Sequence, residues 1–387
     1  MSLQKKNIFI VAGGTGGHII PARCLGEELS KTHKVIFFGD KKISSYINKE
    51  DAFKTKIILS SQIRKSVFSL ISAAIKIFVG MLQSVFYVII HNPKYIVAFG
   101  GYSTFPTLIA GVIFKKKIIL HEQNAHLGKV NRIFAKYAYK IALSFPKTDG
   151  IGKELNGKII VVGNPVRKEI LALNDLNYEL PVVKHPELRK DNKMGYNVIL
   201  KSDFTPQTIK RDLFRILVIG GSGGAKIFSE VLPKAFFNLK DDIKANIVIT
   251  QQCRPELTKS TFEQYRSYNL NIVIDSFFKD MPAIIKESHL IIARSGSSSI
   301  FEFCAAKKPM ILIPFAKSSD DHQQKNANYL EKLGAAIVVK EEELNINEFS
   351  DLLNNLIQDG SILKKMSKNS AKVTPQDAVA KMIGLIQ

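Results

Sequence analysis

The feature that most constrains this chain is a short glycine-rich segment that occurs twice, about two hundred residues apart. Residues 10–17 read IVAGGTGG, and residues 218–224 read VIGGSGG. Each copy is an apolar strand that runs into glycines and one hydroxyl residue, as in nucleotide-binding α/β folds. A chain of 387 residues, 45% of them hydrophobic, can form a core in each of two such domains. We therefore predict an α/β protein with two Rossmann-like, doubly wound domains that face each other across a cleft.

The alternation of apolar and polar segments predicts where these domains begin and end. We expect an N-terminal domain over residues 1–166, a C-terminal domain over 167–365, and a last segment, 366–387, whose helix packs back toward the N-terminal domain. The charged and weakly periodic stretch 184–212 is typical of an exposed insertion. The last helix is expected to follow Thr374, a good N-cap residue.

Charge and cysteine content narrow the function classes. The net charge of +21 favours an anionic partner, although a lysine-rich composition in an AT-rich genome explains part of it. No zinc-finger spacing, RNP-like pattern or basic zipper supports nucleic-acid binding. The three cysteines, Cys24, Cys253 and Cys304, form no CxxC pair, so we expect neither a disulfide framework nor a zinc site. The first apolar stretch is too short for a signal peptide, and we expect a cytoplasmic protein.

Residues 66–90 form the most apolar segment and predict a long amphipathic helix with a wide apolar face. Its small and polar residues make one narrow stripe: Ser66, Ser69, Ser72, Lys76, Gly80, Gln83 and Ser84. Two interpretations remain open: a helix packed on the sheet, and a helix whose apolar face also enters lipid, aided by Arg64, Lys65 and residues 115–117. A transmembrane helix is disfavoured because a strand with its ligand loop resumes after Pro93.

The glycine loops favour a phosphorylated ligand, since bare N–H groups at a helix start bind anions; the alternative is that the glycines only permit tight turns. Neither loop has the P-loop spacing. Ile19 and Lys226 replace the third glycine of a dinucleotide site, although Asp40 is retained, so an NAD-type oxidoreductase stays an alternative. A sugar nucleotide fits better, with Glu302 for the ribose diol and amides for the sugar.

Seven motifs, in order, carry a resemblance over nearly the whole chain: GGTGGHIIPA, FGGYSTFP, HEQNA, VVGNPVR, GGSGGA, RSGSSSIFE and DDHQQKNA. Together they resemble the family 28 glycosyltransferases of bacterial peptidoglycan synthesis, which convert lipid I to lipid II. The resemblance implies a GT-B fold, UDP-GlcNAc as donor, and inverting transfer to the 4-hydroxyl of the muramyl residue of lipid I. It also implies no cofactor or metal, and peripheral attachment to the cytoplasmic face of the inner membrane. Roles in cell wall biogenesis, cell shape and cell division follow, with contacts to other proteins of those processes.

The resemblance also implies site residues. It places the acceptor site and membrane attachment on the N-terminal domain and the UDP-GlcNAc site on the C-terminal domain. The donor-binding residues are Thr15, Gly16, Gly17, Asn124, Arg167, Ser222, Phe278, Ser297, Ser298, Ser299, Glu302, Gln323 and Gln324. The acceptor-binding residues are Gly101, Tyr102, Ser103 and His121. His18 is the expected general base, because imidazole titrates near neutral pH, and Glu122 is the second candidate. A noncatalytic membrane-associated nucleotide-binding module is the remaining alternative.

Overall fold

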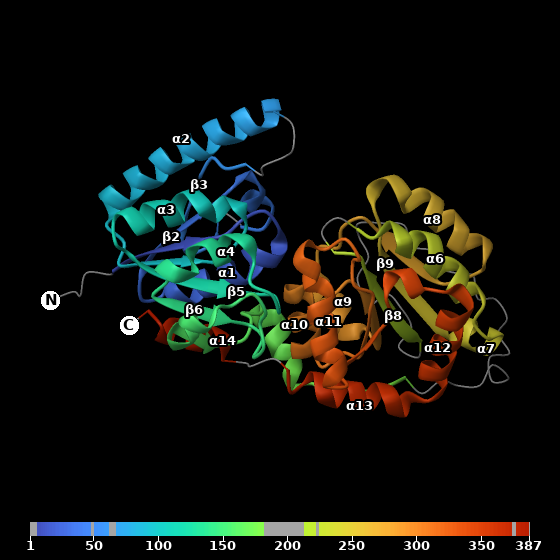
Figure 1. The fold of residues 1–387 in the computed structure, drawn as a ribbon. Helices are drawn as coiled ribbons and strands as arrows, with labels where there is room; N and C mark the ends of the chain where they lie inside the picture. Colours follow the sequence, from blue (N-terminus) through green and yellow to red (C-terminus); the bar gives the residue numbers. More distant parts are fainter. Residues whose placement is uncertain are drawn as a thin grey trace. The chain divides into compact units, whose positions relative to one another are not determined.

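The computed structural model describes residues 6–47, 50–61, 67–181, 213–221, 224–373 and 377–386, without the side chains of 67–69. The chain divides into two compact units: unit 1 comprises residues 1–168 and 375–387, and unit 2 comprises residues 169–374. Each unit contains one parallel sheet flanked by helices (Figure 1). The expected insertion over 184–212 and the residues Arg64, Lys65, Ser222 and Thr374 lie outside the described residues.

Unit 1 is built on a seven-stranded parallel sheet with the order β3-β2-β1-β4-β5-β6-β7. Its strands are β1 (Asn7–Val11), β2 (Lys34–Gly39), β3 (Lys54–Ile57), β4 (Tyr95–Ala98), β5 (Lys117–Glu122), β6 (Lys140–Leu143) and β7 (Ile159–Val161). Its helices are α1 (Gly16–Leu29), α2 (Val67–His91), α3 (Phe105–Ile113), α4 (Lys129–Phe134) and α14 (Ala378–Gly384). The chain order reverses beside β1, the point where open α/β sheets bind ligands at the carboxyl ends of their strands.

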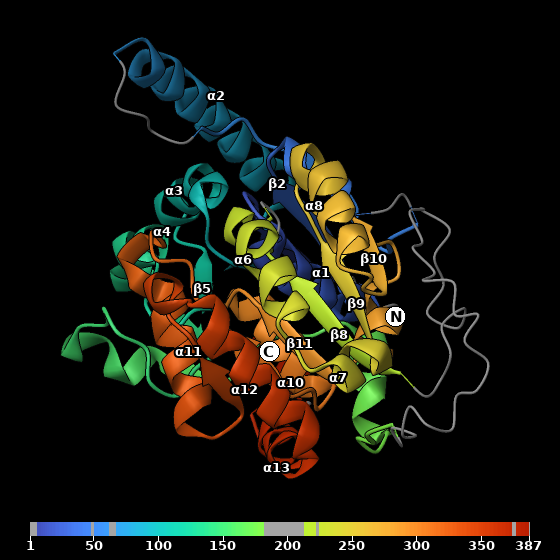
Figure 2. The ribbon, with the colours of Figure 1, turned by 90° about the vertical axis from the view of Figure 1, so that its right-hand side faces the viewer.

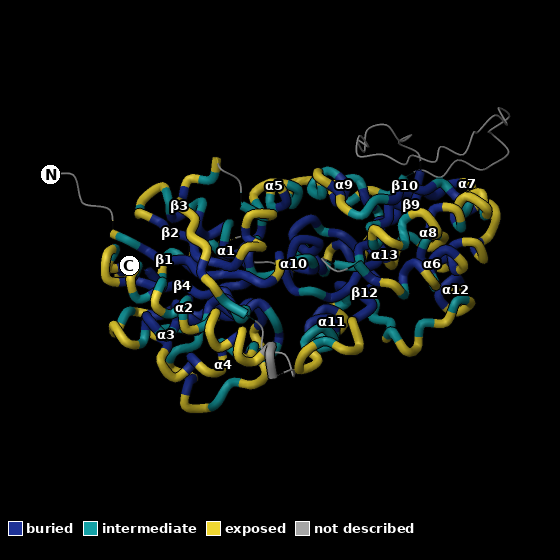
Figure 3. Tube along the Cα trace, turned by 90° about the horizontal axis from the view of Figure 1, so that it is seen from above, coloured by how far each residue is buried: buried dark blue, intermediate teal, exposed yellow. Residues whose placement is uncertain are grey.

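Alternating side chains of the central strand serve two separate cores. Ile8 and Ile10 of β1 pack on the face covered by α1 and α14, whereas Phe9 and Val11 pack on the face that carries α3 and α4. All four are fully buried, as the dark tube of the sheet shows (Figure 3). An apolar run without polar positions is therefore what a strand buried on both faces requires.

Unit 2 repeats this plan with a six-stranded parallel sheet of order β10-β9-β8-β11-β12-β13. Its strands are β8 (Phe214–Ile219), β9 (Ile247–Gln252), β10 (Ile272–Asp275), β11 (Leu290–Ala293), β12 (Met310–Leu312) and β13 (Ala336–Val338). Its helices are α6 (Lys226–Phe237), α7 (Asp241–Asn246), α8 (Pro255–Ser267), α9 (Met281–Glu287), α10 (Ser297–Ala305), α11 (His322–Lys332), α12 (Ile346–Gln358) and α13 (Gly360–Ser370), while the short α5 (Lys168–Leu171) spans the boundary between the units. Figure 2 shows α6 and α8 beside β8 and β9.

The end of the chain differs from the expected boundary at residue 366. Helix α13 continues to Ser370, because its Leu363 and Met366 are buried in the core of unit 2. The return to unit 1 begins only at residue 375. There Met382 and Ile386 are buried in the core beside α1.

Helix α2 packs on unit 1 in an unexpected orientation. Part of its small and polar stripe turns inward: Gly80 lies against the Leu59 carbonyl, and Ser84 Oγ lies 3.1 Å from Thr107 Oγ1 of α3, whereas Ser72 and Lys76 are exposed. Its large apolar side chains are exposed instead, among them Ile71, Ile75, Phe78, Leu82, Phe86, Ile89 and Ile90. Both ribbon views place α2 at the edge of unit 1 (Figures 1 and 2). Residues 70–91 are long and apolar enough to cross a membrane by length and composition alone.

Candidate active site

The first glycine loop leads directly from β1 into α1. The helix begins at Gly16, with Thr15 as an extended N-cap. Pro21 lies inside the helix, where it has no N–H to donate to the carbonyl four residues earlier. The sequence GTGGH thus forms the N-terminus of a 14-residue helix, whose partial positive charge favours an anion.

The glycines of this loop permit close contact with residues 101–103. A side chain at Gly13 would collide with Ser103 Oγ, and one at Gly101 would lie 2.6 Å from the Gly13 carbonyl oxygen. Gly101 also has a φ of +85°, which only glycine adopts without strain. Ser103 is fully buried in this contact, so its side chain supports the loop and is not exposed to a ligand.

Asp40, at the end of β2, holds the glycine loop from the other side. Its Oδ2 accepts hydrogen bonds from the Tyr102 hydroxyl, at 2.6 Å, and from the Gly14 N–H, at 3.2 Å. Burial and this bond to Asp40 raise the pKa of Tyr102, so the phenol stays protonated. Because the carboxylate that the dinucleotide alternative needed for a ribose is already bound to protein groups, the structure gives that alternative no support.

His18, in the first turn of α1, is linked by hydrogen bonds to the end of β5. Its Nδ1 lies 2.9 Å from Oε1 of Gln123, and Nε2 of Gln123 lies 2.9 Å from Nδ1 of His121. His121 in turn places its Nε2 3.1 Å from the carbonyl oxygen of Gly163. His121 is completely buried, and burial lowers its pKa to about 4, so it is neutral near pH 7. Its side chain therefore supports this linkage and is not exposed to an acceptor.

Glu122 ends β5 with its carboxylate fully engaged. Oε1 accepts from the N–H and the side-chain amide of Asn124, and Oε2 accepts from the Gly128 N–H and from Asn131 Nδ2, at 2.8–3.2 Å. Only 2% of the residue is exposed. Because its hydrogen bonds all go to protein groups, this carboxylate organises the loop that carries Asn124. His18 is therefore a better candidate than Glu122 for taking a proton from a ligand.

The second glycine loop joins β8 to α6 in unit 2. Gly221 and Gly224 have φ values of +80° and +63°, which glycine adopts freely. A side chain at Gly224 would lie 2.6 Å from Cγ of Arg254, the residue that precedes α8. Sequence reasoning missed this arginine, because nothing in QQCRPE marks it as a neighbour of a loop thirty residues earlier.

Helix α10 brings together the predicted residues of the RSGSSS segment. It begins at Ser297, and Ser298 and Glu302 lie one turn apart on it, buried to 8% and 7% exposure, whereas Ser299 is half-buried. All three therefore lie on a helix that follows β11 at the carboxyl edge of the sheet. Phe278, also buried, follows the carboxyl end of β10, two strands away in the sheet order from β8.

Helix α11 carries the predicted residues Gln323 and Gln324, whose side-chain amides have different hydrogen-bond partners. Gln323 Oε1 accepts from the Phe315 N–H at 3.0 Å, and its backbone carbonyl accepts from Ser295 Oγ at 2.8 Å. Gln324 donates instead to Asn328 Oδ1 at 2.7 Å. Asp320 and Asp321, just before the helix, adopt left-handed backbone conformations that cost a non-glycine residue energy. Gln323 thus connects α11 with both the RSGSSS loop and the loop after β12.

Arg294 connects the loop after β12 with Glu341 through hydrogen bonds. The sequence analysis did not identify this residue. Its Nη1 donates to the carbonyls of Ile313 and Pro314 at 3.0 Å, and both terminal nitrogens reach Glu341, at 2.9 and 3.1 Å. Partial burial raises the pKa of Glu341, but the bonds from Arg294 and from the Ala316 N–H lower it more, so the net shift is downward. An arginine directly after a buried apolar strand is the signal that could have found it.

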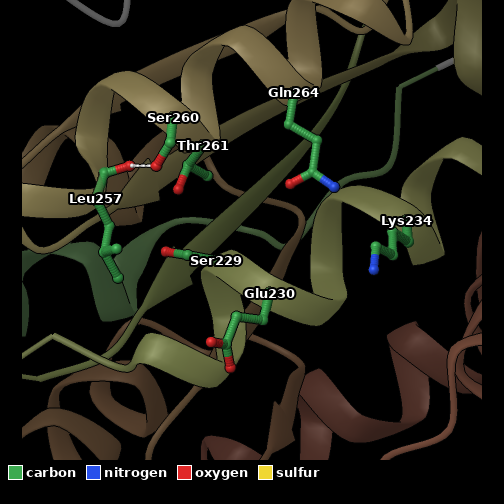
Figure 4. Close-up of a pocket in the computed structure, with 7 residues that line it drawn as sticks. All are labelled: Ser229, Glu230, Lys234, Leu257, Ser260, Thr261 and Gln264. Atoms are coloured by element: carbon green, nitrogen blue, oxygen red, sulfur yellow. Dashed lines mark hydrogen bonds between the residues drawn. The ribbon is translucent and has the colours of Figure 1, made fainter.

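Arg167 and a separate pocket lie apart from the loops described above. Arg167 is half-buried at the end of unit 1, beside α5. A pocket of about 290 Å³ lies between α6 and α8, lined by Ser229, Glu230 and Lys234 of α6 and by Leu257, Ser260, Thr261 and Gln264 of α8 (Figure 4). None of the predicted site residues lines this pocket. It gives no separate indication of a ligand.

Comparison with known proteins decides the family. The glycosyltransferase family 28 N-terminal domain matches residues 8–143, and the family 28 C-terminal domain matches residues 215–382. A relative from Rhodospirillum rubrum is 31% identical over 98% of this chain and 91% of its own length, and one from Caulobacter vibrioides is 31% identical over 99% of both. The chain belongs to glycosyltransferase family 28. Both relatives are named UDP-N-acetylglucosamine–N-acetylmuramyl-(pentapeptide) pyrophosphoryl-undecaprenol N-acetylglucosamine transferase.

Solved structures agree with the fold of a family 28 enzyme. The crystal structure of MurG from Acinetobacter baumannii has a TM-score of 0.71, with 23% identity and 99% of both chains covered. The UDP-GlcNAc 2-epimerase from Neisseria meningitidis has a TM-score of 0.66 at 14% identity. The predictions of a GT-B fold and of a glycosyltransferase are thus confirmed. Within family 28, the loops of unit 1 and unit 2 described above are the candidate acceptor and donor sites.

Proposed function

We propose that this protein transfers GlcNAc from UDP-GlcNAc to the 4-hydroxyl of the muramyl sugar of lipid I, forming lipid II for peptidoglycan synthesis. The observation that carries the proposal is the similarity, over almost the full length of both chains, to relatives named for this transfer. The described residues among those predicted support it: most lie in loops after strands or in the first turn of the next helix, where α/β sheets bind ligands.

In the proposed reaction the acceptor oxygen attacks the anomeric carbon of GlcNAc directly, with inversion. The new C–O bond forms as the bond from that carbon to the diphosphate breaks, and UDP leaves with the electron pair. His18 takes the hydroxyl proton on Nε2, because Nδ1 faces Gln123. The start of α10, and Arg167, supply positive potential for the departing diphosphate.

The donor site is proposed on unit 2, with Glu302 binding the ribose diol and Gln323 and Gln324 binding the sugar. Of these amides, Gln323 has its oxygen bound to the Phe315 N–H, which leaves its NH₂ group to donate to a sugar hydroxyl. The backbone at Phe278 is proposed to meet the uracil, and the α10 serines the diphosphate. Thr15, Gly16, Gly17 and Asn124, on unit 1, stay predicted donor-binding residues that rest on the family resemblance.

Replacing Glu302 by alanine tests this assignment. Loss of the ribose contacts is expected to raise the KM for UDP-GlcNAc by roughly tenfold or more, since a hydrogen bond to a charged group contributes about 1.5–3 kcal/mol. Transfer of labelled GlcNAc to a soluble lipid I analogue measures it, with Glu263→Ala on the exposed side of α8 as the matched control. An unchanged KM in the Glu302 variant would contradict the ribose assignment.

We further propose that unit 1 attaches to an anionic membrane surface through the exposed side of α2. Eight large apolar side chains of the described part of α2 are each more than 40% exposed, whereas Ala73, Gly80 and Ser84 are buried. Ile113, 62% exposed at the end of the neighbouring α3, extends the apolar surface to the lysines at 115–117. An apolar face bordered by lysines matches a lipid surface with negative headgroups. A lipid-linked acceptor resides on such a surface.

Placing charge on this face tests the attachment. The double variant Phe78→Glu/Phe86→Glu is expected to lose at least about tenfold in binding to phosphatidylglycerol vesicles, because burial of each phenylalanine contributes roughly 1.5–3 kcal/mol. Vesicle sedimentation measures the bound fraction. Ile362→Glu, on an exposed apolar residue of α13, is the control and should bind as the unmodified protein does. Equal binding of all three proteins would contradict the proposal.

A further inference from the structure

Hydrogen bonds link His18, Gln123, His121 and Gly163 in series. The carbonyl of Gly163 determines which atom donates in each of them. The backbone oxygen of Gly163 can only accept, so Nε2 of His121, 3.1 Å away, must carry a proton. His121 is fully buried and neutral near pH 7, because burial lowers its pKa to about 4. It holds one proton only, so its Nδ1 presents a lone pair.

This lone pair fixes the orientation of the Gln123 amide. The group 2.9 Å from Nδ1 of His121 must donate, and it is the NH₂ of Gln123, whose second proton reaches the His121 carbonyl at 3.3 Å. The opposite orientation would place two acceptors against each other in a buried site. Oε1 of Gln123 therefore faces His18, and Nδ1 of His18, at 2.9 Å, must donate to it.

We propose that Gln123 and His121 are positioning residues that hold His18 as its Nδ1–H tautomer, with the lone pair of Nε2 available to the acceptor hydroxyl. The proposal rests on the proposed function only for what Nε2 does in catalysis. Among the described residues no hydrogen bond from the protein reaches Nε2 of His18. A histidine with the opposite tautomer would present a proton to the hydroxyl and could not accept one.

The surroundings of His18 allow this role to be tested by pH. Besides neutral His121, the titratable groups on the neighbouring elements are Asp40 and Lys42 after β2, Tyr102 after β4 and Glu122 on β5. Each is bound to other protein groups: Asp40 to Tyr102 and Gly14, Lys42 to the Gly14 carbonyl, and Glu122 to its own loop. Substitution of Gln123 leaves these groups in place, because none of these bonds involves it.

Two variants of Gln123 test the proposal. Gln123→Met keeps the shape but removes both bonds, and it should lower kcat at least about tenfold, part of the roughly 10²–10⁴-fold that a general base contributes, without raising the KM for UDP-GlcNAc. In Gln123→Glu one carboxyl oxygen accepts from Nδ1 of His18, and the other must carry a proton to donate to the lone pair of His121 Nδ1. This variant keeps both bonds, so it should restore most of the kcat that Gln123→Met loses. The rise of kcat/KM with pH, which needs unprotonated His18, should stay where it is in the unmodified protein.

The tautomer itself is measured in the resting protein by ¹⁵N NMR with labelled histidine, using His18→Gln to assign the signal. We expect His18 to be protonated on Nδ1 in the unmodified protein and to shift toward the Nε2–H form in Gln123→Met. His18 protonated on Nε2 in the unmodified protein would overturn the proposal, as would unchanged tautomer and kcat in the methionine variant. If Gln123→Met fails to fold, the spectrum of the unmodified protein still decides. If the unmodified protein shows the expected tautomer but transfers no GlcNAc, the proposed function is wrong, whereas the proposal that Gln123 and His121 position His18 is supported.

Discussion

Replacing His18 by glutamine is expected to lower kcat for GlcNAc transfer by roughly 10²–10⁴-fold, the usual contribution of a general base. Glutamine can still bond to Gln123 and occupies a similar volume, so the glycine loop and the start of α1 should keep their structure. The KM for UDP-GlcNAc should change little, because glutamine leaves the predicted donor-binding residues of the glycine loop in place and the proposed ribose and sugar contacts lie on unit 2. Steady-state kinetics at saturating donor and acceptor measures both constants.

The matched control is His33→Gln, in the turn after α1, where Nδ1 of the imidazole lies 2.9 Å from the Thr32 hydroxyl. This variant should have unaltered kinetics. A His18 variant that turns over at a near-normal rate with saturating substrates would show that another group takes the proton. Glu122, the second candidate, would need to exchange one of its four hydrogen bonds for the substrate hydroxyl.

Replacing Arg294 by methionine is expected to give the largest loss of stability. It leaves the carbonyls of Ile313 and Pro314 and the carboxylate of Glu341 without their partner. Breaking a buried pair costs about 3–5 kcal/mol, and we expect the lower end because Glu341 keeps 22% of its side chain exposed. For a unit of about 200 residues this corresponds to a Tm lower by roughly 6–12 °C.

The same variant should weaken donor binding, because the loop after β12 also holds Gln323 through the Phe315 N–H. Thermal unfolding and calorimetric titration with UDP-GlcNAc measure the two effects. Arg266→Met, at an exposed arginine whose side chain is 66% accessible, is the control and should change neither value. A Tm unchanged in Arg294→Met would show that the ion pair contributes little and that the loops are held by other contacts.

The sheets and the ligand-binding edge could be predicted from the sequence, because they depend on local patterns. Continuous apolar runs such as NIFIV and FRILVI are typical of strands buried on both faces, and glycine with one hydroxyl residue marks each strand-to-helix turn. Those two signals indicated a tandem Rossmann-like protein before any contact was known. The family resemblance added the site residues, which no single spacing defines.

Other features depend on tertiary contacts and could not be read locally. The sequence of α2 shows a narrow stripe of small and polar residues, but only the close approach of Leu59 and Thr107 shows that its Gly80 and Ser84 face the protein, whereas Ser72 and Lys76 are exposed. Likewise, His121 and Ser103 lie in motifs that resemble an acceptor site, yet both are completely buried beneath it. Arg254 is a single arginine whose neighbour Gly224 comes from a distant segment, so no local pattern could identify it.

The measurement that tests the central claim most directly is transfer of labelled GlcNAc from UDP-GlcNAc to a lipid I analogue, with EDTA present and the product analysed by NMR. We predict one GlcNAc on the 4-hydroxyl of the muramyl sugar, in the β configuration, with stoichiometric release of UDP. Binding of UDP-GlcNAc without any transfer to this acceptor, or a product with the retained α configuration, would contradict the account.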